Sequence, residues 1–262
     1  MRRAKSPRRE ALGRGGVLLV ILLFGLINSQ LTAQDAYPTG PEAGRELAAE
    51  LRSMRPAEEF KWSGILKILG RGHQSISVPV ACQTTLTATN WSVTYFTSAT
   101  ATSGAEKLTV NFSTNAPNQY IYARAEAPGG PLGEAKTLSG AEADIPLAGS
   151  DFWLSDLGFE FYHWPDQVRL PGEMRRSRPC YLLESTNPHP SAGGYARVLT
   201  WVDKDSNQPL QAEAQGANRK VIKEFQVGSV EKIHDHYVVK DLRMSNNKTG
   251  SHTELEFNLD EK

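Results

Sequence analysis

Apolar side chains recur at every second position in a series of short segments from residue 60 onward, and this alternation constrains the fold most. Strict alternation places one face of a strand in a core and the other in water, which is typical of antiparallel sheets. Stretches rich in Ser, Thr, Gly and Asn separate the segments and supply turns. The predicted strands are 60–69, 75–87, 91–96, 107–113, 120–125, 179–184, 195–202, 209–214, 220–230, 237–244 and 254–259.

One segment before the strands has helical periodicity instead. Leu47, Leu51 and Met54 form a single apolar stripe at a spacing close to 3.6 residues. Pro41 suits the first position of a helix. With a helix over 41–54 and so many strands, the sequence predicts an α+β fold in which one large curved antiparallel sheet carries helices on one face.

A second candidate helical segment, 151–164, reads DFWLSDLGFEFYHW and is unusually aromatic. Ser150 is a suitable N-terminal cap, and Pro165 ends the segment. Its large apolar side chains are Phe152, Trp153, Leu157, Phe159, Phe161, Tyr162 and Trp164. A helix with this composition cannot hide its apolar surface on one narrow stripe. Either it is clamped in the core on two sides, or part of it lines a cavity.

The first 33 residues have the order of a secretory signal peptide: a basic start, the apolar run 17–27, a polar break, and a small residue for cleavage, Ala33. The apolar run is shorter than a membrane-spanning helix requires, although a retained anchor remains the alternative. We therefore expect a cleaved signal at 1–33 and one mature domain at 34–262. Arg8 and Arg9 leave the choice between a general and a twin-arginine signal open.

Charge and cysteine content narrow the classes of function. Residues 1–33 hold six of the 29 Lys and Arg side chains but only one of the 29 acidic ones, so the mature domain is mildly acidic. Such a domain lacks the broad basic surface expected of a nucleic-acid-binding protein. Export to an oxidising compartment predicts a disulfide between Cys82 and Cys180, with two buried free thiols as the alternative.

The sequence carries no recognisable catalytic or cofactor-binding motif. Phosphate-binding glycine loops, the His-Glu-x-x-His metal motif and the Gly-x-Ser-x-Gly nucleophile motif are absent. His234, Asp235 and His236 are the one cluster with metal-ligand side chains, but no third ligand is marked, so a solvated strand end is the preferred interpretation. We expect a protein that is not an enzyme and has neither a metal nor a cofactor.

Several short motifs together resemble those of the outer-membrane lipoprotein-sorting family of LolA-like proteins. They are 147–157 (LAGSDFWLSDL), Trp164-Pro165, Arg178-Pro179-Cys180-Tyr181, Tyr195, Trp201-Val202-Asp203-Lys204, 210–214 (LQAEA), and Thr253, Leu255 and Phe257. The resemblance covers most of 40–262 and is strongest over 147–260. It implies a strongly curved, incomplete antiparallel β-barrel, covered on its concave face by helices. It also implies an apolar cavity between sheet and helices that shields the acyl chains of a lipoprotein crossing the periplasm, without covalent chemistry.

This resemblance, combined with the alternation, leads to a functional hypothesis. We expect a monomeric periplasmic carrier that binds lipoprotein acyl chains or a related amphiphile during outer-membrane lipoprotein sorting. The predicted lipid-binding residues are Leu66, Ile68, Val80, Val93, Tyr95, Leu108, Val110, Trp153, Leu157 and Phe161. Their choice rests on alternation, and a register error of one residue would exchange the faces. The alternative is a non-catalytic envelope protein that uses the curved sheet to bind a protein partner.

Overall fold

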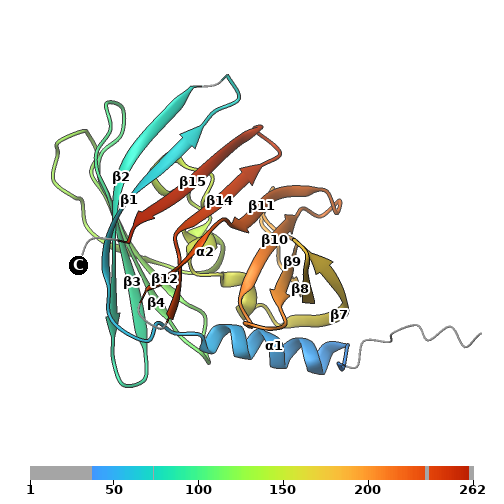
Figure 1. Ribbon diagram of the computed structural model, residues 1–262. Helices are drawn as coiled ribbons and strands as arrows, with labels where there is room; N and C mark the ends of the chain where they lie inside the picture. Colours follow the sequence, from blue (N-terminus) through green and yellow to red (C-terminus); the bar gives the residue numbers. More distant parts are fainter. Residues whose placement is uncertain (1–36, 73, 234–235, 260–262) are drawn as a thin grey trace, which may run out of the picture. The chain divides into compact units, whose positions relative to one another are not determined.

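The computed structural model describes residues 37–72, 74–233 and 236–259 (Figure 1). Segment 1–33, predicted to be a cleaved signal, lies outside these residues, as do His234 and Asp235 of the histidine cluster. None of the helices in the described part of the chain is long and apolar enough to cross a membrane.

The described strands form one antiparallel sheet of thirteen strands and a separate two-stranded hairpin. The strands of the large sheet are β1 (Lys61–Leu69), β2 (Ser75–Leu86), β3 (Trp91–Thr97), β4 (Glu106–Phe112), β5 (Gln119–Arg124), β6 (Lys136–Leu138), β7 (Asp166–Arg175), β8 (Arg178–Thr186), β9 (Arg197–Asp203), β10 (Pro209–Gln215), β11 (Val221–Val227), β14 (Asp241–Asn246) and β15 (Ser251–Asn258). The hairpin consists of β12 (Val230–Ile233) and β13 (His236–Val239).

The order of strands across the sheet is β6-β5-β4-β3-β2-β1-β15-β14-β11-β10-β9-β8-β7. The edge strands β6 and β7 do not pair with each other, so the sheet is open. The α+β class with a mostly antiparallel, unclosed sheet and few helices, as predicted from the sequence, is thereby confirmed.

The strand register places the alternating apolar side chains on one face of the sheet. Leu66 lies opposite Val78 on β2 and Leu255 on β15. Tyr95 lies opposite Cys82 and Leu108 in the same way. On the distant half of the sheet, Phe225 lies opposite Ala212 and Met244. We refer to the face that carries these side chains as the inner face, and all of them are buried in one hydrophobic cluster.

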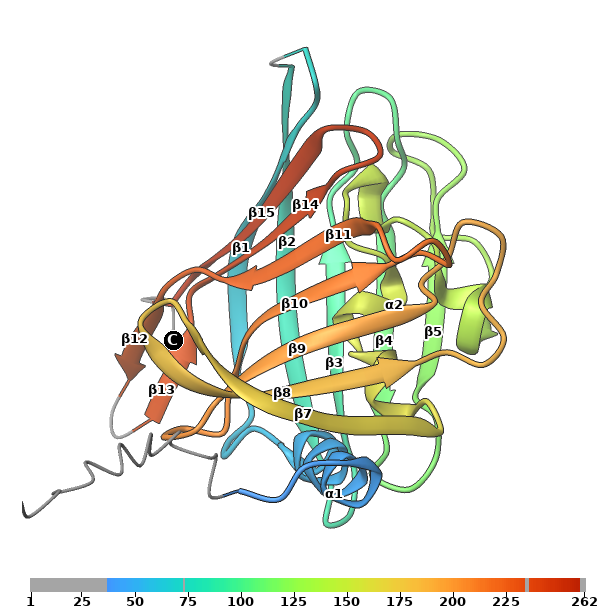
Figure 2. The same ribbon diagram turned by 90° about the vertical axis from the view of Figure 1, so that its right-hand side faces the viewer.

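The two halves of the sheet meet around this cluster. Figure 2 shows strands β8–β11 running across strands β2–β5, and Figure 1 shows the short helix α2 (Leu154–Leu157) between the two sets. Buried side chains from both halves and from α2 belong to the same cluster. The inner face therefore bounds the core of the described domain on two sides.

The first helix, α1, spans Pro41–Ser53, close to the predicted range of 41–54. Its buried side chains include Leu47 and Leu51, and the helix packs along the edge strand β7. The other helical pieces are short 3-10 turns: η1 (Gly140–Ala143), η2 (Leu147–Gly149) and η3 (Glu160–His163). Together, η2, α2 and η3 account for the helical turns of the stretch 147–164, which we term the aromatic segment.

The predicted disulfide is corrected by the structure, in which Cys82 and Cys180 are both free and buried. Cys82 faces the main cluster. Cys180 belongs to a second cluster with Leu182 and Trp201. Successive residues of a strand point to opposite faces, so Cys180 and Leu183 lie on opposite faces of β8. Leu183 points into the main cluster, and Cys180 points away from it. The two thiols therefore lie in different packing environments.

Candidate functional site

The aromatic segment contacts strands from both halves of the sheet. The ring of Phe159 packs edge-on against Phe225 of β11, with the centroids 5.6 Å apart. Glu160 accepts a hydrogen bond of 2.9 Å from the hydroxyl of Tyr120 on β5. Trp153 stacks on Tyr195, which precedes β9, at a centroid distance of 4.6 Å. The segment is thus held between the two halves.

A buried ion pair lies at the centre of this contact. The Nζ atom of Lys223 on β11 lies 3.3 Å from the Oδ2 atom of Asp156 on α2. Both side chains are only 5% exposed. The same carboxylate oxygen accepts bonds from the Trp153 amide at 2.8 Å and the Tyr195 hydroxyl at 3.2 Å. The Lys223 ammonium also lies 3.6 Å from the centroid of the Trp153 ring, a cation–π arrangement. Burial lowers the pKa of Lys223.

Further side-chain hydrogen bonds attach the aromatic segment to its surroundings. The carboxylate of Asp151 accepts bonds from the hydroxyls of Ser251 and Thr253 on β15, at 2.6 and 2.9 Å. The amide of Asn118 donates to the carbonyl oxygen of Gly158 at 2.8 Å. Side-chain bonds such as these can be released without breaking the backbone ladder of the sheet, because the ladder uses only main-chain groups.

Two titratable groups of η3 have strongly shifted pKa values. Burial raises the pKa of Glu160 to about 7, although the hydrogen bond from Tyr120 works in the opposite direction. Burial is the main cause that lowers the pKa of His163 to about 4, and the positive charge of Arg52 adds to the shift. At neutral pH His163 is therefore uncharged, while Glu160 is close to the midpoint of its titration.

Replacing Glu160 with Gln is expected to change how stability depends on pH. The folded-state pKa of Glu160 lies above its ordinary value of 4.5, so folding favours the protonated form. Its stabilisation is present below about pH 4.5 and is lost as the pH rises through about 7. Glu160→Gln does not carry this dependence. The difference in unfolding free energy, variant minus unmodified protein, should therefore rise by roughly 2–3 kcal/mol as the pH is raised from about 4.5 to about 7.

Urea denaturation followed by circular dichroism at a series of pH values measures this difference. His163 acts in the opposite direction, because its lowered pKa makes stability fall as the pH decreases from about 6.5 towards 4. The comparison must therefore be made between the variant and the unmodified protein, in which the contribution of His163 cancels. A constant difference across the pH range would contradict the role assigned to Glu160.

The ten residues predicted to bind lipid all lie in or against the main cluster. Leu66, Val80, Val93, Tyr95, Leu108, Val110, Leu157 and Phe161 are buried in it, and Ile68 and Trp153 are partly buried and packed against it. The structure thus brings together strand residues and residues of the aromatic segment that are distant in sequence.

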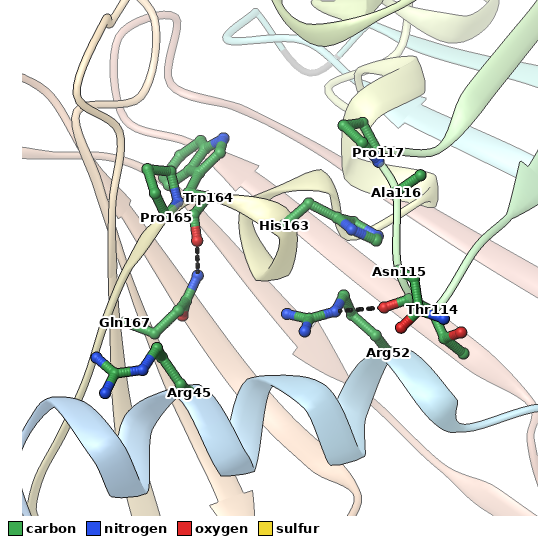
Figure 3. Close-up of a pocket in the computed structure, with 10 residues that line it drawn as sticks. All are labelled: Arg45, Arg52, Thr114, Asn115, Ala116, Pro117, His163, Trp164, Pro165 and Gln167. Carbon is green, nitrogen blue, oxygen red and sulfur yellow. Dashed lines mark hydrogen bonds between the residues drawn. The ribbon is translucent and has the colours of Figure 1, made fainter.

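Two surface pockets open at the edge of the main cluster. One, of about 340 Å³, lies between α1, the turn 114–117 and the end of the aromatic segment (Figure 3). The other, of about 620 Å³, is lined by the loops 190–194 and 216–220, by Val221 and Ile222 at the start of β11, and by Asn247 and Lys248. None of the ten predicted residues lines either pocket. In this state the aromatic segment itself occupies the inner face.

Lys223 is one residue of this site that the sequence analysis missed, although the sequence carries a signal for it. In β11, Lys223, Phe225 and Val227 are two residues apart and are all buried. The alternation therefore assigns Lys223 to the inner face, where a lysine needs a partner of opposite charge. The partner, Asp156, is 67 positions away and cannot be identified from the local pattern.

A metal site needs several His, Cys, Asp or Glu side chains close together. Within residues 37–72, 74–233 and 236–259, no group of three or more His, Cys, Asp or Glu side chains is arranged to hold a metal ion. His234 and Asp235 of the histidine cluster lie outside these residues.

Comparisons with known proteins agree with the architecture. A family profile described as "Uncharacterized protein" matches residues 88–260. A solved DUF1329 family protein from Desulfovibrio piger has a TM-score of 0.66, with 17% identity over 83% of this chain and 91% of its own. No curated protein sequence matches.

Two further solved structures have the same fold. A putative outer membrane lipoprotein-sorting protein domain from Vibrio parahaemolyticus has a TM-score of 0.63, with 18% identity over 84% of this chain and 94% of its own. A LolA superfamily protein from Nitrosomonas europaea has a TM-score of 0.58, with 16% identity over 84% and 92%. At these identities the likeness establishes the fold.

Proposed function

The chain belongs to the LolA-like family, and we propose on that basis that it is a periplasmic carrier that shields the acyl chains of a lipoprotein or a related amphiphile. The similar structure from Vibrio parahaemolyticus is that of a putative outer membrane lipoprotein-sorting protein domain, which favours a role in outer-membrane lipoprotein sorting. We further propose that the segment 1–33 directs export and is removed. No covalent step is part of this function.

The observation that carries the proposal is the apolar inner face together with the segment that occupies it. Side chains such as Leu66, Tyr95 and Leu108 form a continuous apolar surface across neighbouring strands. Burying an acyl chain on such a surface gains about 0.8 kcal/mol for each CH₂ group. A chain of ordinary length therefore needs no charged anchor to bind.

In the proposed cycle, the aromatic segment and the ligand alternate on the inner face. The aromatic segment supplies apolar side chains, among them Leu157 and Phe161, where the acyl chain would lie. Side-chain bonds to Asp151, Asp156 and Glu160 attach the segment to the sheet. The segment and the helical turns around it would act as a cover for the concave face, and ligand binding would displace them.

Leu157→Asp tests this function through binding of a fluorescent fatty-acid probe. Leu157 is buried at the inner face, so a carboxylate there places an unpaired charge in the acyl path. We expect the affinity for the probe to fall by well over tenfold while the circular dichroism spectrum of the sheet is retained. Organic extracts of the natively purified protein should contain a defined lipid in stoichiometric amount by mass spectrometry.

Leu132→Asp is the matched control, because Leu132 is an exposed leucine outside the cluster. It should leave probe binding unchanged. A Leu157→Asp protein that unfolds would identify Leu157 as a residue of the permanent core, because a buried unpaired carboxylate costs several kcal/mol. A folded variant with unchanged binding, repeated at Trp153 and Phe161, would contradict the carrier function of this segment.

One observation favours the second candidate, a non-catalytic envelope protein that binds a protein partner through the sheet. On the face opposite the inner face, Ile65 is 42% exposed and Phe96 is 38% exposed. Ile65 lies opposite Pro79, and Phe96 lies opposite Ala81, so the four side chains share one side of β1, β2 and β3. Loss of partner capture by Phe96→Ser, with probe binding intact, would favour this candidate.

A further inference from the structure

The pocket beside α1 is built from three separate parts of the chain. Arg45 and Arg52 extend from α1, His163 comes from η3, and the turn 114–117 closes the far side (Figure 3). Trp164 adds an aromatic wall next to His163. The resulting space of about 340 Å³ can hold a small headgroup.

The charge in this pocket is positive and is not neutralised. Among the residues that the structure describes, no Asp or Glu lines the pocket. Arg52 donates from Nε to the carbonyl oxygen of Thr114 at 3.1 Å and from Nη1 to that of Tyr162 at 2.6 Å. Both acceptors are uncharged. Arg45 and Arg52 form no ion pair in the described part of the chain. A guanidinium has five N–H donors, so Arg52 keeps donors for a ligand.

The surroundings of Arg52 favour an anion over water. Arg52 is only partly exposed, and burial lowers its pKa. A partly desolvated cation without a counter-charge gains more from an anion than a fully hydrated one does. His163 is uncharged at neutral pH, so its ring can donate one hydrogen bond without adding repulsion between cations.

The pocket is continuous with the aromatic segment. Trp164, which lines the pocket, packs edge-on against Phe161, with the centroids 6.3 Å apart. Phe161 belongs to the main cluster and is one of the residues predicted to bind lipid. A ligand whose charged end lies between Arg45 and Arg52 could therefore extend its apolar part past Trp164 towards the inner face.

We propose that this pocket binds the anionic headgroup, a phosphate or carboxylate, of the amphiphile that the inner face carries. Arg45 and Arg52 supply charge-assisted hydrogen bonds to the headgroup, and His163 and the turn 114–117 complete its walls. The inference rests on the proposed carrier function and adds to it the chemical class of the ligand. It also supplies the discrimination between cargoes that apolar burial alone does not provide.

The test compares three probes by isothermal titration calorimetry on the purified protein: dodecyl phosphate, the uncharged dodecyl maltoside, and inorganic phosphate. We expect dodecyl phosphate to bind most tightly. Arg45→Gln and Arg52→Gln should each weaken its binding about tenfold or more, because each removes charge-assisted hydrogen bonds. Binding of dodecyl maltoside should change by less than twofold. Arg45 is exposed and its replacement should not affect folding, so it keeps the test interpretable if Arg52→Gln is destabilised.

Arg55→Gln is the matched control, since Arg55 follows α1 and does not line the pocket, and its side chain bonds, within the described residues, only to the main-chain carbonyl oxygens of Thr87 and Ala88. It should leave all three affinities unchanged. Equal binding of the charged and uncharged amphiphiles, unaffected by Arg45→Gln, would overturn the headgroup site and leave the carrier function standing. Binding of inorganic phosphate as tight as that of dodecyl phosphate would overturn the headgroup assignment in favour of a free anion. Binding of neither amphiphile would overturn both proposals.

Discussion

Replacing Asp156 with Ala is expected to lower the free energy of unfolding by about 3–5 kcal/mol. The substitution removes the carboxylate that pairs with the buried ammonium of Lys223, and it leaves the hydroxyl of Tyr195 without its acceptor. It also removes the carboxylate that accepts the Trp153 amide at the start of α2. Urea denaturation at neutral pH, followed by circular dichroism, measures the loss.

The double variant Asp156→Ala/Lys223→Met separates the lost ion pair from the lost packing. Removing both charges eliminates the uncompensated cation, so the double variant should recover more than half of the loss. The exposed pair Lys67–Glu256 is the matched control, and Lys67→Met should cost less than about 1 kcal/mol. A loss below about 1 kcal/mol for Asp156→Ala would show that the aromatic segment does not depend on this pair.

Gly44→Ala should destabilise the protein although alanine favours helix formation by about 1 kcal/mol over glycine. A Cβ atom at Gly44 would lie 2.6 Å from the backbone C and O atoms of Gln167 and from Cα of Val168, all on β7. Main-chain atoms cannot rotate away, so α1 must move off the strand. We expect a loss of about 2–3 kcal/mol in the free energy of unfolding, typical of an overfilled contact.

Ala49→Gly, at an exposed position of the same helix, is the control for helix propensity and should cost about 1 kcal/mol. Gly44→Ala raises helix propensity and Ala49→Gly lowers it, yet both should lower the free energy of unfolding. Because Arg45 follows Gly44 directly and Gln167 lines the pocket beside α1, Gly44→Ala should also weaken dodecyl phosphate binding. An increase in stability would mean that α1 does not approach β7 as closely as described.

Two elements with one buried and one exposed face were located closely from the sequence. The predicted strand 91–96 and the observed β3 (Trp91–Thr97) differ by one residue, and the helix predicted over 41–54 is α1 (Pro41–Ser53). In both, a single periodicity decides the structure because only one face contacts the core. The choice of inward-facing residues on these strands followed from the same alternation.

Strand β7 was missed for reasons that its position explains. Pro171 and Gly172 lie within it, and the pairing with β8 is irregular between Leu170 and Glu173. An edge strand tolerates proline because one side of its backbone needs no partner. The turn to β8 uses Arg176 and Ser177 with positive φ angles, without the Asn-Gly signal that usually marks such a turn.

The parts of the site that the sequence did not reveal all depend on contacts between distant residues. Asp156 meets Lys223 only because α2 lies between the two halves of the sheet. Arg52 meets His163 only because α1 packs beside the aromatic segment. Local patterns identify the inward position of a lysine or the face of a helix, but they do not identify what lies opposite across the fold.

The pairing of β1 with β15 has a consequence for how the inner face comes into existence. Every other pair in the large sheet joins strands that are near neighbours along the chain, whereas Lys67 of β1 contacts Glu256 of β15 across 189 positions. Forming a contact over such a separation costs loop-closure entropy before any pairing energy is gained, so it is a slow step. Hairpins among β1–β6, and hairpins among the strands from β7 to β15, can form early, but each group alone is an incomplete sheet. The apolar surface on which a ligand would lie is assembled only when the most distant strands have met.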